Sequence, residues 1–251
     1  MTDSRFNQQV VMITGAASGF GQLLAQRLAA GQARLVLGDR NEEGLRSVAQ
    51  ALRNTGAQVV DLACDVTREA QVKAMVDAAV NTFGRLDIGI NNAGTGTPPK
   101  ALIDTEEAEL DFNFAVNAKG VFFGMKHQIR QMLTQGNGII LNVASMAGIG
   151  GAPKLTAYCA AKHAVVGMTR TAAVEYARKN IRINAVCPFY SPTPLVTEGL
   201  GLSQEFLAQG SPMRRLGSPD EMVSAMLGII DPANSYLHGQ AIAVDGGVSA
   251  Y

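Results

Sequence analysis

Residues 10–30 read VVMITGAASGFGQLLAQRLAA, and this stretch decides the fold. The apolar run Val10–Ile13 predicts a buried strand, and Gln22–Ala30 predicts a helix. Between them, Thr14–Gly21 carries a cluster of glycines. Glycines let the backbone turn tightly and approach a pyrophosphate group, which the positive N-terminus of the helix then binds. The stretch predicts the first strand–turn–helix unit of a dinucleotide-binding domain.

The rest of the chain repeats this alternation of strand and helix. Apolar runs typical of strands buried on both faces occur at Val10–Ile13, Ala33–Leu37, Gln58–Leu62, Leu86–Ile90, Ile139–Val143, Ile181–Val186 and Ala241–Val244. Such alternation implies right-handed crossovers and a parallel sheet that is covered by helices on both faces. We therefore predict one α/β domain over residues 1–251, a Rossmann-like, doubly wound parallel sheet of about seven strands.

Capping signals mark several helix ends. Residues that accept the left-handed conformation lie shortly before five of the predicted strands: Gly31, Gly56, Gly84, Gly136 and Asn180. Ser218 and Glu221 fit a capping box, with proline at the first helical position. Asn41 is a weaker start signal, as is Asp104 with Glu107.

Composition excludes several classes of protein. Lys and Arg number 21 and so do Asp and Glu, so the chain has no net charge to attract nucleic acid or an anionic membrane. No apolar run reaches the roughly 18 residues of a membrane span. The first residues, MTDSRFNQQ, include no apolar segment that would mark export. We expect a cytoplasmic protein with a small-molecule substrate and neither nucleic acid nor membrane as partner.

The cysteines and histidines give no sign of a metal site. Cys64, Cys159 and Cys187 lack the CxxC spacing, so we expect free thiols that pack as small apolar groups in a reducing compartment. Cys159, beside Tyr158, has the alternative interpretation of a reactive thiol. The three histidines are scattered without metal-ligand spacing, and no bound metal is predicted.

The end of the second predicted strand carries the residues that bear on cofactor choice. Asp39 follows the glycine cluster at about the distance where a carboxylate binds the adenosine ribose 2′-hydroxyl. A carboxylate there would repel a 2′-phosphate, which favours NAD(H) over NADP(H). The neighbouring Arg40 could bind that phosphate instead. Alternatively, Asp39 caps the next helix, a role that Asn41 could already fill.

A second informative stretch, Ser145–Lys162, reads SMAGIGGAPKLTAYCAAK. Tyr158 and Lys162 are four residues apart in helix-favouring sequence and share one face, while Ser145 follows a predicted strand. Lowering a tyrosine pKa from about 10 to about 7 requires about 4 kcal/mol. One ammonium about 4 Å away, at an effective dielectric constant of about 20, supplies about that much. The stretch predicts a proton-transfer site, although a Tyr–Lys pair alone also fits an ordinary helix surface.

Together these features resemble the short-chain dehydrogenase/reductases, and the resemblance covers essentially the whole chain. The matching motifs are Thr14–Gly21, Cys64–Val66, Asn91–Gly94, Asn117 in FAVNAKG, Ser145 in NVASMAG, Tyr158–Lys162 and Arg182–Pro188. Family members are single Rossmann-like domains that oxidise alcohols or reduce ketones with a nicotinamide dinucleotide. Phe189 departs from the family pattern, in which glycine usually follows the proline.

The resemblance implies a role for each matching residue. Tyr158 would be the general acid/base, Lys162 would lower its pKa and hold the nicotinamide ribose, Ser145 would bind the substrate oxygen, and Asn117 would hold a proton-relaying water. The implied cofactor-binding residues are Gly15, Ser18, Gly19, Phe20, Gly21, Asp39, Arg40, Asp65, Val66, Asn91, Ala93, Gly94, Tyr158, Lys162, Pro188 and Thr193. The expected cofactor is NAD, with NADP as the alternative.

The substrate site is placed by the resemblance and by adjacency to the catalytic residues. Candidate residues are Ser145, Met146, Leu155, Phe189, Tyr190, Leu195 and Val196, within or near a loop at about 189–209 that should contain one short helix at most. They are mostly apolar and include no Arg or Lys. We therefore expect a secondary alcohol/ketone pair on an uncharged, fairly hydrophobic molecule.

Two other functions remain as alternatives. A 3-oxoacyl-carrier-protein reductase would prefer NADPH and need a basic patch, which Asp39 and the balanced charge disfavour. A dinucleotide-sensing scaffold without catalysis should lack one of the four proton-handling residues, yet all four are present. The family resemblance also implies a homotetramer assembled through the helices near Leu110–Leu133 and Thr156–Lys179, which carry small and apolar residues on more than one face.

Overall fold

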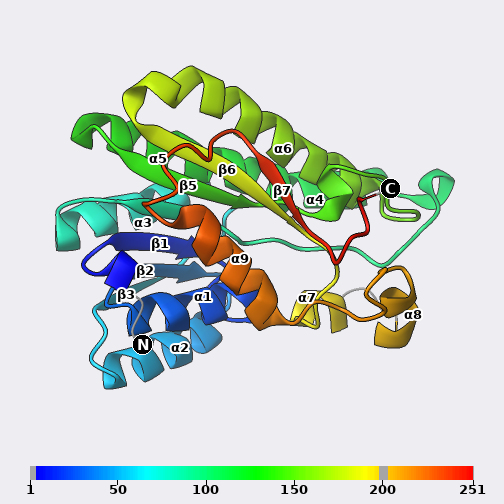
Figure 1. Cartoon of the computed structure of the whole chain (residues 1–251), viewed down its shortest axis with the longest axis horizontal. Coiled ribbons are helices and arrows are strands. Elements are labelled where there is room, and N and C mark those ends of the chain that lie inside the picture. Colours follow the sequence, from blue (N-terminus) through cyan, green and yellow to red (C-terminus); the bar gives the residue numbers. More distant parts are fainter. Residues whose placement is uncertain (1–3, 198–202, 251) are drawn as a thin grey trace.

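A single sheet of seven parallel strands, in the order β3-β2-β1-β4-β5-β6-β7, organises the described residues of the computed structural model (Figure 1). The structure describes residues 4–197 and 203–250. The strands are β1 (Val10–Thr14), β2 (Arg34–Asp39), β3 (Val59–Ala63), β4 (Ile88–Asn91), β5 (Gly138–Val143), β6 (Ile181–Pro188) and β7 (Ala241–Val244). All seven predicted strands are present, which confirms the predicted fold class.

Several strands run past the end of their apolar pattern. Thr14 pairs with Gly38 between β1 and β2, and Pro188 pairs with Val244 between β6 and β7. Backbone pairing therefore continues after the side chains become small or polar. These extensions carry the polar and glycine residues to the carboxyl edge of the sheet.

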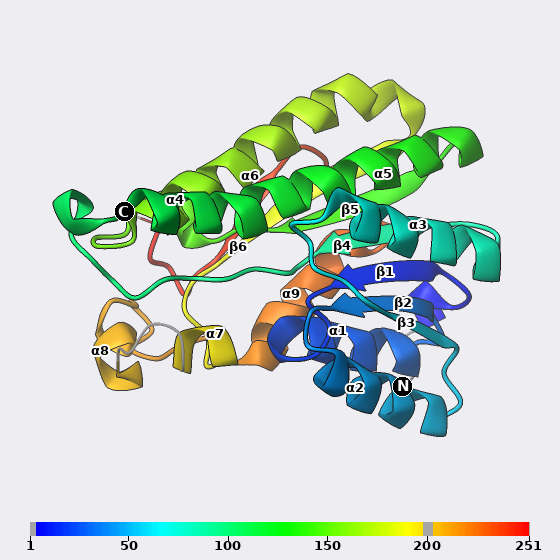
Figure 2. The same ribbon diagram turned by 180° about the vertical axis from the view of Figure 1, so that it is seen from behind.

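Helices cover both faces of the sheet (Figures 1 and 2). They are α1 (Gly19–Ala30), α2 (Glu42–Asn54), α3 (Glu69–Phe83), α4 (Glu107–Asn113), α5 (Gly120–Gln135), α6 (Thr156–Tyr176), α7 (Pro194–Thr197), α8 (Gln204–Gln209) and α9 (Pro219–Ile230). Residues of α1, α2 and α9 form one apolar core with the sheet, and residues of α3, α5 and α6 form the other. Two cores around one sheet make the doubly wound arrangement.

Most of the capping signals are confirmed. Ser218 and Glu221 form the capping box of α9, and Asn41 Oδ1 accepts a hydrogen bond from Gly44 N at 3.1 Å. Four of the five expected helix-ending residues have positive φ, but Gly31 has φ −83° because the chain turns at Gln32 instead. The Asp104 start signal is wrong. Asp104 lies in a short 3₁₀ turn, and α4 is capped by the pair Glu106 and Glu109.

The loop predicted at 189–209 contains more helix than expected. Both α7 and α8 fall within it, and they lie beyond the carboxyl ends of the strands (Figure 2). Residues 198–202 of this loop lie outside the described residues. The prediction of one short helix at most is therefore wrong.

The strand order places a ligand crevice between β1 and β4. After β1 the chain builds β2 and β3 on one side, and it then crosses to build β4 to β7 on the other. The loops that leave β1 and β4 consequently diverge at the carboxyl edge, which is where ligands bind in open α/β sheets. Among the described residues, no helix is long and apolar enough to cross a bilayer, and no cluster of His, Cys, Asp or Glu could hold a metal ion.

Candidate active site

A cleft of about 1240 Å³ runs along the carboxyl edge of the sheet. Of the predicted site residues, it is lined by Gly15, Ser18, Gly19, Phe20, Asp39, Arg40, Asp65, Val66, Ala93, Gly94, Ser145, Met146, Leu155, Tyr158, Lys162, Pro188, Phe189, Tyr190, Thr193, Leu195 and Val196. These residues come from loops after six different strands and from α6. The topology therefore brings residues from nearly the whole length of the chain into one hollow.

The turn between β1 and α1 leaves its backbone open to the cleft. Gly15 and Gly19 have φ of +69° and +54°, values that L side chains rarely adopt. A Cβ at Gly15 would lie 2.8 Å from Ala93 Cα, and one at Gly21 would overlap the Gly15 carbonyl oxygen. In the described structure Ser18, at the N-cap of α1, makes no side-chain capping bond. These glycines, with the open helix N-terminus, fit the pyrophosphate of a dinucleotide.

Gly21 nevertheless lies outside the cleft lining. Its role is to let α1 pack closely on the turn, so the prediction that it contacts the cofactor is not supported by its position. Phe20 does line the cleft and also packs against the core beside α1.

Asp39 lines the cleft at the end of β2, between the turn after β1 and the start of α2. We call this part of the cleft the adenosine end, because the dinucleotide's adenosine is expected there. Asp39 Oδ2 accepts a hydrogen bond from Ala17 N at 3.0 Å, and its Oδ1 accepts one from Asn41 N at 2.9 Å. Because Asn41 itself caps α2, Asp39 is not the helix cap. Each carboxylate oxygen keeps a further lone pair with which it can accept a bond from a ribose hydroxyl.

Asp65 faces the same end of the cleft. Burial raises its pKa, but hydrogen bonds from the backbone and side chain of Thr67 lower it more, and the positive charges of Arg68 and Arg40 add to the lowering. The net effect is a pKa below the usual aspartate value. Arg40 is thus close enough to act on Asp65 while it lies beside Asp39.

Asn91 is a correction to the predicted cofactor-binding set. It is 3% exposed, and its Nδ2 donates to Gln128 Oε1 at 3.0 Å and to Asn142 Oδ1 at 2.8 Å. The side chain turns into the core between the sheet and α5, where Gly124 leaves room for it. Asn91 stabilises the strands, whereas its neighbours Ala93 and Gly94 line the cleft.

Ser145, Tyr158 and Lys162 meet at the centre of the cleft. The Ser145 side chain lies near enough to the Tyr158 phenol to lower its pKa. Lys162 is 3% exposed, and its Nζ donates to Val143 O at 2.9 Å and lies 5.6 Å from the centroid of the Tyr158 ring. The predicted proximity of these three residues is therefore present.

The expected direction of the tyrosine shift is wrong for the protein alone. Burial raises the pKa of Tyr158 to about 12, which outweighs the lowering by the nearby Ser145 hydroxyl. Burial also lowers the pKa of Lys162 to about 8. Desolvation disfavours the charged form of both groups, and for Tyr158 this effect is the largest contribution to the shift. At neutral pH the Tyr158 phenol is consequently protonated and can donate a proton.

Asn117 lies behind Lys162 and outside the cleft lining. It belongs to a π-helical turn, Phe114–Lys119, and such turns are frequent at functional sites. Its Oδ1 accepts a bond from Thr95 N at 2.9 Å, and its Nδ2 donates to Thr95 O at 2.9 Å. A Cβ at Gly94 would lie 3.1 Å from Asn117 Oδ1 and 3.5 Å from Lys162 Nζ. Glycine at 94 thus lets Asn117 and Lys162 approach the same point.

The substrate end of the cleft is largely apolar. The rings of Phe189 and Tyr190 pack edge to face, with centroids 4.8 Å apart. Leu155, Val196 and Leu207 form a small cluster against which Tyr158 and Tyr190 pack. The helices that follow β6 therefore complete the wall opposite the catalytic residues.

The sequence patterns missed several residues of this cleft. They include Phe112, Ala115 and Val116 from the α4 region, Ile149, Ser191, and Val248 and Ser249 near the C-terminus. Only the topology brings the α4 region and the C-terminus to the site, so no local pattern signals them. For Ser191, a polar residue directly after the long strand β6 was an available signal.

Comparison with known proteins agrees with this site. A family model described as Enoyl-(Acyl carrier protein) reductase matches residues 15–249. Levodione reductase of Leifsonia aquatica is 38% identical, over 98% of this chain and 96% of that protein. Cis-4-hydroxycyclohexanecarboxylate dehydrogenase of Sinomonas cyclohexanicum is 39% identical over 98% of both. Cyclohexanol dehydrogenase of Acinetobacter sp. is 34% identical, over 97% of this chain and 96% of that protein.

Solved structures show the same architecture. The crystal structure of levodione reductase superposes with a TM-score of 0.93 at 38% identity, covering 98% of this chain and 100% of the other. A 3-ketoacyl-(acyl-carrier-protein) reductase from Brucella melitensis, complexed with NADH, has a TM-score of 0.91 at 36% identity, with 97% and 99% covered. ElxO with bound NADP has a TM-score of 0.91 at 28% identity, with 97% and 100% covered. The chain therefore belongs to the short-chain dehydrogenase/reductase family and is an NAD(P)-dependent oxidoreductase of alcohol and ketone groups.

Proposed function

We propose that this protein interconverts a ring-bearing, uncharged secondary alcohol and its ketone, with NAD(H) as the preferred cofactor. The observation that carries the proposal is the position of Ser145 and Tyr158, which both line the cleft where its polar dinucleotide half meets its apolar half. A hydroxyl and a phenol at that junction can hold one substrate oxygen while the rest of the substrate contacts apolar side chains.

The chemistry divides between the cofactor and the protein. When it is bound, the dinucleotide supplies or accepts the hydride. Tyr158, protonated because its pKa is about 12, donates the proton to the substrate oxygen in the reduction direction. Ser145 hydrogen-bonds the same oxygen, and Lys162 next to the ring favours the charged phenolate that remains. We assign Asn117 a positioning role, because its amide holds the loop at Thr95 behind Lys162.

The substrate class rests on the lining of the apolar end. Of the described residues that line the cleft, the only lysine and arginine are Lys162 and Arg40, and Arg40 lies at the adenosine end. The substrate end therefore offers a carboxylate no free cation. Ring-bearing alcohols are favoured because two relatives are named for cyclohexane substrates and because the Phe189–Tyr190 pair offers flat apolar surfaces. One of those substrates carries a carboxylate, so charged analogues belong in the test.

The preference for NAD(H) rests on Asp39. Its carboxylate lines the cleft after β2, fixed by two backbone N–H groups, and a 2′-phosphate placed there would be repelled. The related structures bind NADH in one case and NADP in another, so the family alone does not decide.

A 3-oxoacyl-carrier-protein reductase is the second candidate, favoured by the Brucella structure. The decisive experiment follows reduced-nicotinamide absorbance with NAD and NADP in parallel. The panel holds cyclohexanol-type alcohols, carboxylated analogues and a 3-oxoacyl thioester. We expect the best kcat/KM for uncharged ring alcohols with NAD. Best turnover of the thioester with NADPH, or of carboxylated rings, would contradict the proposal.

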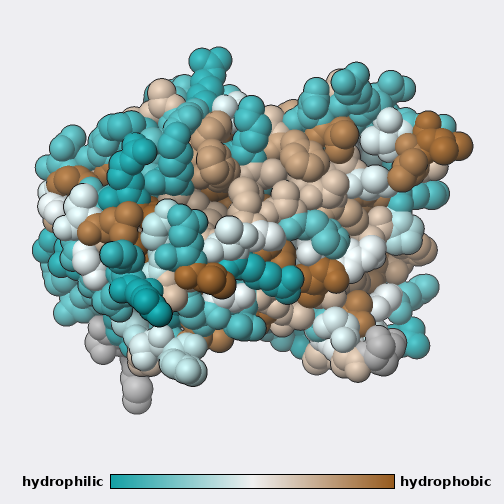
Figure 3. Space-filling model, turned by 90° about the horizontal axis from the view of Figure 1, so that it is seen from above, coloured by the Kyte–Doolittle hydropathy of each residue, from teal (hydrophilic) through white to brown (hydrophobic). Residues whose placement is uncertain are grey.

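We further propose a homotetramer that works in the cytoplasm. Apolar residues gather over the face formed by α5 and α6 (Figure 3), where Phe122 and Val174 are 48% and 82% exposed. Ala160, Ala164 and Met168 are only half-buried on α6, so small and apolar residues face outward there. Such a surface suits packing against a second copy. Light scattering at micromolar concentration should give the mass of four chains, and cell fractionation should place the protein in the soluble cytoplasmic fraction.

A further inference from the structure

The buried residue of α4 is an amide. All of α4 is described, and within it only Asn113 is buried, with 0% exposure, whereas Leu110 and Phe112 are 39% and 41% exposed. Burying an amide is costly unless its polar atoms form hydrogen bonds, and an apolar residue would fill the same place at lower cost. The reason for an amide at this position therefore lies in the groups that its side chain contacts.

The Asn113 side chain contacts Asn117, one helical turn later. Asn113 Nδ2 donates to Glu109 O at 2.9 Å, a bond that only the amide nitrogen can make, so the oxygen of the Asn113 amide points away from Glu109. That oxygen accepts from Asn117 Nδ2 at 3.2 Å. Asn113 Nδ2 also donates to Thr97 Oγ1 at 3.3 Å. Glu109 thus fixes the orientation of Asn113, and Asn113 in turn restrains the Asn117 amide.

The Asn117 amide brings its oxygen close to Lys162. Asn117 is 0% exposed, and its Nδ2 donates to Thr95 O and to Asn113 Oδ1. Its Oδ1 accepts from Thr95 N at 2.9 Å, which leaves one lone pair on that oxygen. A Cβ on Gly94 would lie 3.1 Å from Asn117 Oδ1 and 3.5 Å from Lys162 Nζ. The free lone pair and the lysine nitrogen therefore lie about the same point.

The two amides are aligned in series. In each, the nitrogen is directed back toward α4 and the oxygen forward, so the negative ends of both dipoles lie on the Lys162 side. Hydrogen bonds in a chain polarise one another, and a negative dipole end favours a nearby ammonium. Helix α6, which carries Lys162, lies beside α4 and α5 (Figure 2) and packs against the π-helical turn that carries Asn117.

The ionisable neighbours of Lys162 do not supply a negative charge at neutral pH. Tyr158 lies beside it on α6, and Cys187 lies near it on β6. Burial raises their pKa values to about 12 and about 11, so both groups are neutral at pH 7. Aligned amide dipoles consequently matter for the charged form of this lysine.

We propose that Asn113 is a positioning residue for catalysis: it holds the Asn117 amide with its oxygen toward Lys162 and so favours the ammonium form of that lysine. This role rests on the proposed function, because it acts through Lys162 and Tyr158. Asn113 lies outside every sequence motif that identified the site.

The test compares Asn113→Leu with Thr97→Val in the reduction of cyclohexanone by NADH. Leucine is similar in size to asparagine but has no polar atoms, so Asn117 Nδ2 loses an acceptor. Thr97→Val removes a different partner of Asn113 and keeps the bond to Asn117, and Thr97 lies outside the described lining of the cleft. We expect kcat to fall about 3- to 10-fold in Asn113→Leu, with KM for NADH within about 2-fold of the wild type. Thr97→Val should keep both constants within about 2-fold.

The pH dependence of kcat separates positioning from a general loss of structure. Because the pKa of Lys162 is about 8, reduction by the wild type should slow as pH rises through about 8, where the neutral amine no longer favours the Tyr158 phenolate. In Asn113→Leu the midpoint of this decline should move to lower pH. Asn113→Asp keeps an oxygen for Asn117, so it should restore kcat to within about 3-fold of the wild type with a midpoint that is not lowered. Asn113→Ala removes the same groups as leucine without adding bulk, and it replaces Asn113→Leu if that variant does not fold.

Several results would overturn the proposal. Asn113→Leu could match the wild type in kcat, or its kcat could fall with an unchanged pH midpoint, which would indicate a structural role alone. Thr97→Val could lose as much activity as Asn113→Leu, or Asn113→Asp could fail to restore it. If Lys162→Met reduces cyclohexanone as fast as the wild type, or if the wild type reduces no ketone with either dinucleotide, the proposed function itself fails, an outcome distinct from these.

Discussion

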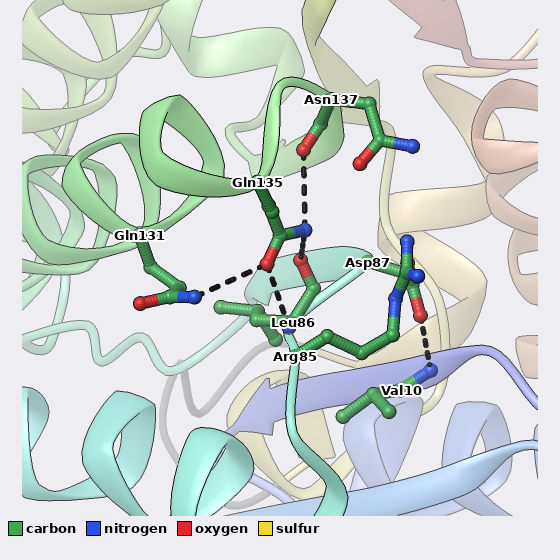
Figure 4. Close-up of polar contacts among 7 residues, drawn as sticks. All are labelled: Val10, Arg85, Leu86, Asp87, Gln131, Gln135 and Asn137. Atoms are coloured by element: carbon green, nitrogen blue, oxygen red, sulfur yellow. Dashed lines mark hydrogen bonds and ion pairs between the residues drawn. The ribbon is translucent and has the colours of Figure 1, made fainter.

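At the amino ends of β1, β4 and β5, side chains of the protein form hydrogen bonds with backbone groups (Figure 4). The carboxyl ends of the strands instead lead into the cleft. Gln135, the last residue of α5, donates to Leu86 O at 2.6 Å and accepts from Leu86 N at 3.2 Å. Asp87 accepts from Val10 N at 2.8 Å and from Arg85 Nε at 2.7 Å. Two buried atoms at this edge of the sheet, Asn137 Oδ1 and Arg34 Nε, have no partner among the described groups, but both residues lie away from the cleft.

The carboxyl ends are built differently. They carry glycines with positive φ and, in the described structure, an N-cap serine without a side-chain cap. Polar side chains therefore have different roles at the two ends of the sheet. At the amino ends they stabilise the fold, and at the carboxyl ends they are available to bind a ligand. Substitutions at the amino ends should therefore lower stability, and substitutions at the carboxyl ends should lower activity or ligand binding.

The largest effect is expected for Tyr158→Phe at the carboxyl end. Removing the phenol oxygen removes the proton donor, so kcat should fall about 10³-fold. The ring still packs against its cluster, so NADH affinity should stay within about 2-fold and the unfolding free energy should not decrease. Absorbance of reduced nicotinamide measures the rate, and calorimetry measures the affinity. Retention of more than a tenth of the activity would remove Tyr158 from the mechanism.

A smaller effect, on stability instead of rate, is expected for Asp87→Ala at the amino end. Asp87 is 6% exposed, and its loss leaves Val10 N without an acceptor and Arg85 without its carboxylate. The unfolding free energy should fall by about 3 kcal/mol while kcat is unchanged. Urea denaturation measures the change.

Asp87→Asn is the control for that experiment. It keeps an oxygen for Val10 N but removes the charge beside Arg85, so its loss should be smaller than that of Asp87→Ala. A fall in kcat for the folded Asp87→Ala protein would show that the two ends of the sheet are coupled, so that stability and ligand binding would not be separate properties of the two ends.

The same contrast explains what could be predicted from the sequence. Apolar runs and glycine spacing predicted all seven strands, the turn at Gly15 and the grouping of Ser145, Tyr158 and Lys162, because each depends on local pattern plus strand order. Asn91 was misplaced because its motif neighbours face the cleft while its own side chain meets Gln128 across the core. Whether a strand-end side chain points to a helix or to the cleft is set by packing with distant residues.

The pKa of Tyr158 shows a second limit of prediction from sequence. Adjacent residues predicted a cation beside a phenol, and the distances agree. Burial of both groups, which only the fold determines, reverses the expected shift of Tyr158. Phe112 and Val248 likewise reach the cleft from remote parts of the chain without any local signal.

The buried charge of Lys162 should make the stability of the protein depend on pH. Its pKa is about 8 in the folded protein and near 10.5 in the unfolded chain, so the unfolded chain binds more protons between these values. The free energy of unfolding of the wild type, relative to Lys162→Met, should therefore rise by about 2 kcal/mol between pH about 8 and about 10. Below pH 8 the difference should be constant.

The difference between the two proteins is the quantity to measure in urea. Burial raises the pKa of Cys64 to about 12 and that of Cys187 to about 11, and both thiols lower stability as pH rises. Cys64 does so in the wild type and in the variant alike, whereas Cys187 lies near Lys162, and loss of the Lys162 charge raises the pKa of Cys187 further in the variant. A difference that stays flat across the window would show that Lys162 titrates normally, so the carboxyl end would tolerate a buried cation without cost.

The smallest effect is expected for Phe189→Gly, which tests the substrate wall. The Phe189 ring lines both the main cleft and a second cavity of about 180 Å³, and it lies near Gly210 after α8. Its removal should join the two spaces and raise the kcat/KM of bulky ring alcohols about 10-fold relative to cyclohexanol, a change of about 1.4 kcal/mol. NADH affinity should not change, because the ring belongs to the apolar half of the cleft. An unchanged ratio, with the protein still folded, would mean that Phe189 packs the loop and does not select the substrate, and the apolar half would then owe its shape to Tyr190 and Leu155 instead.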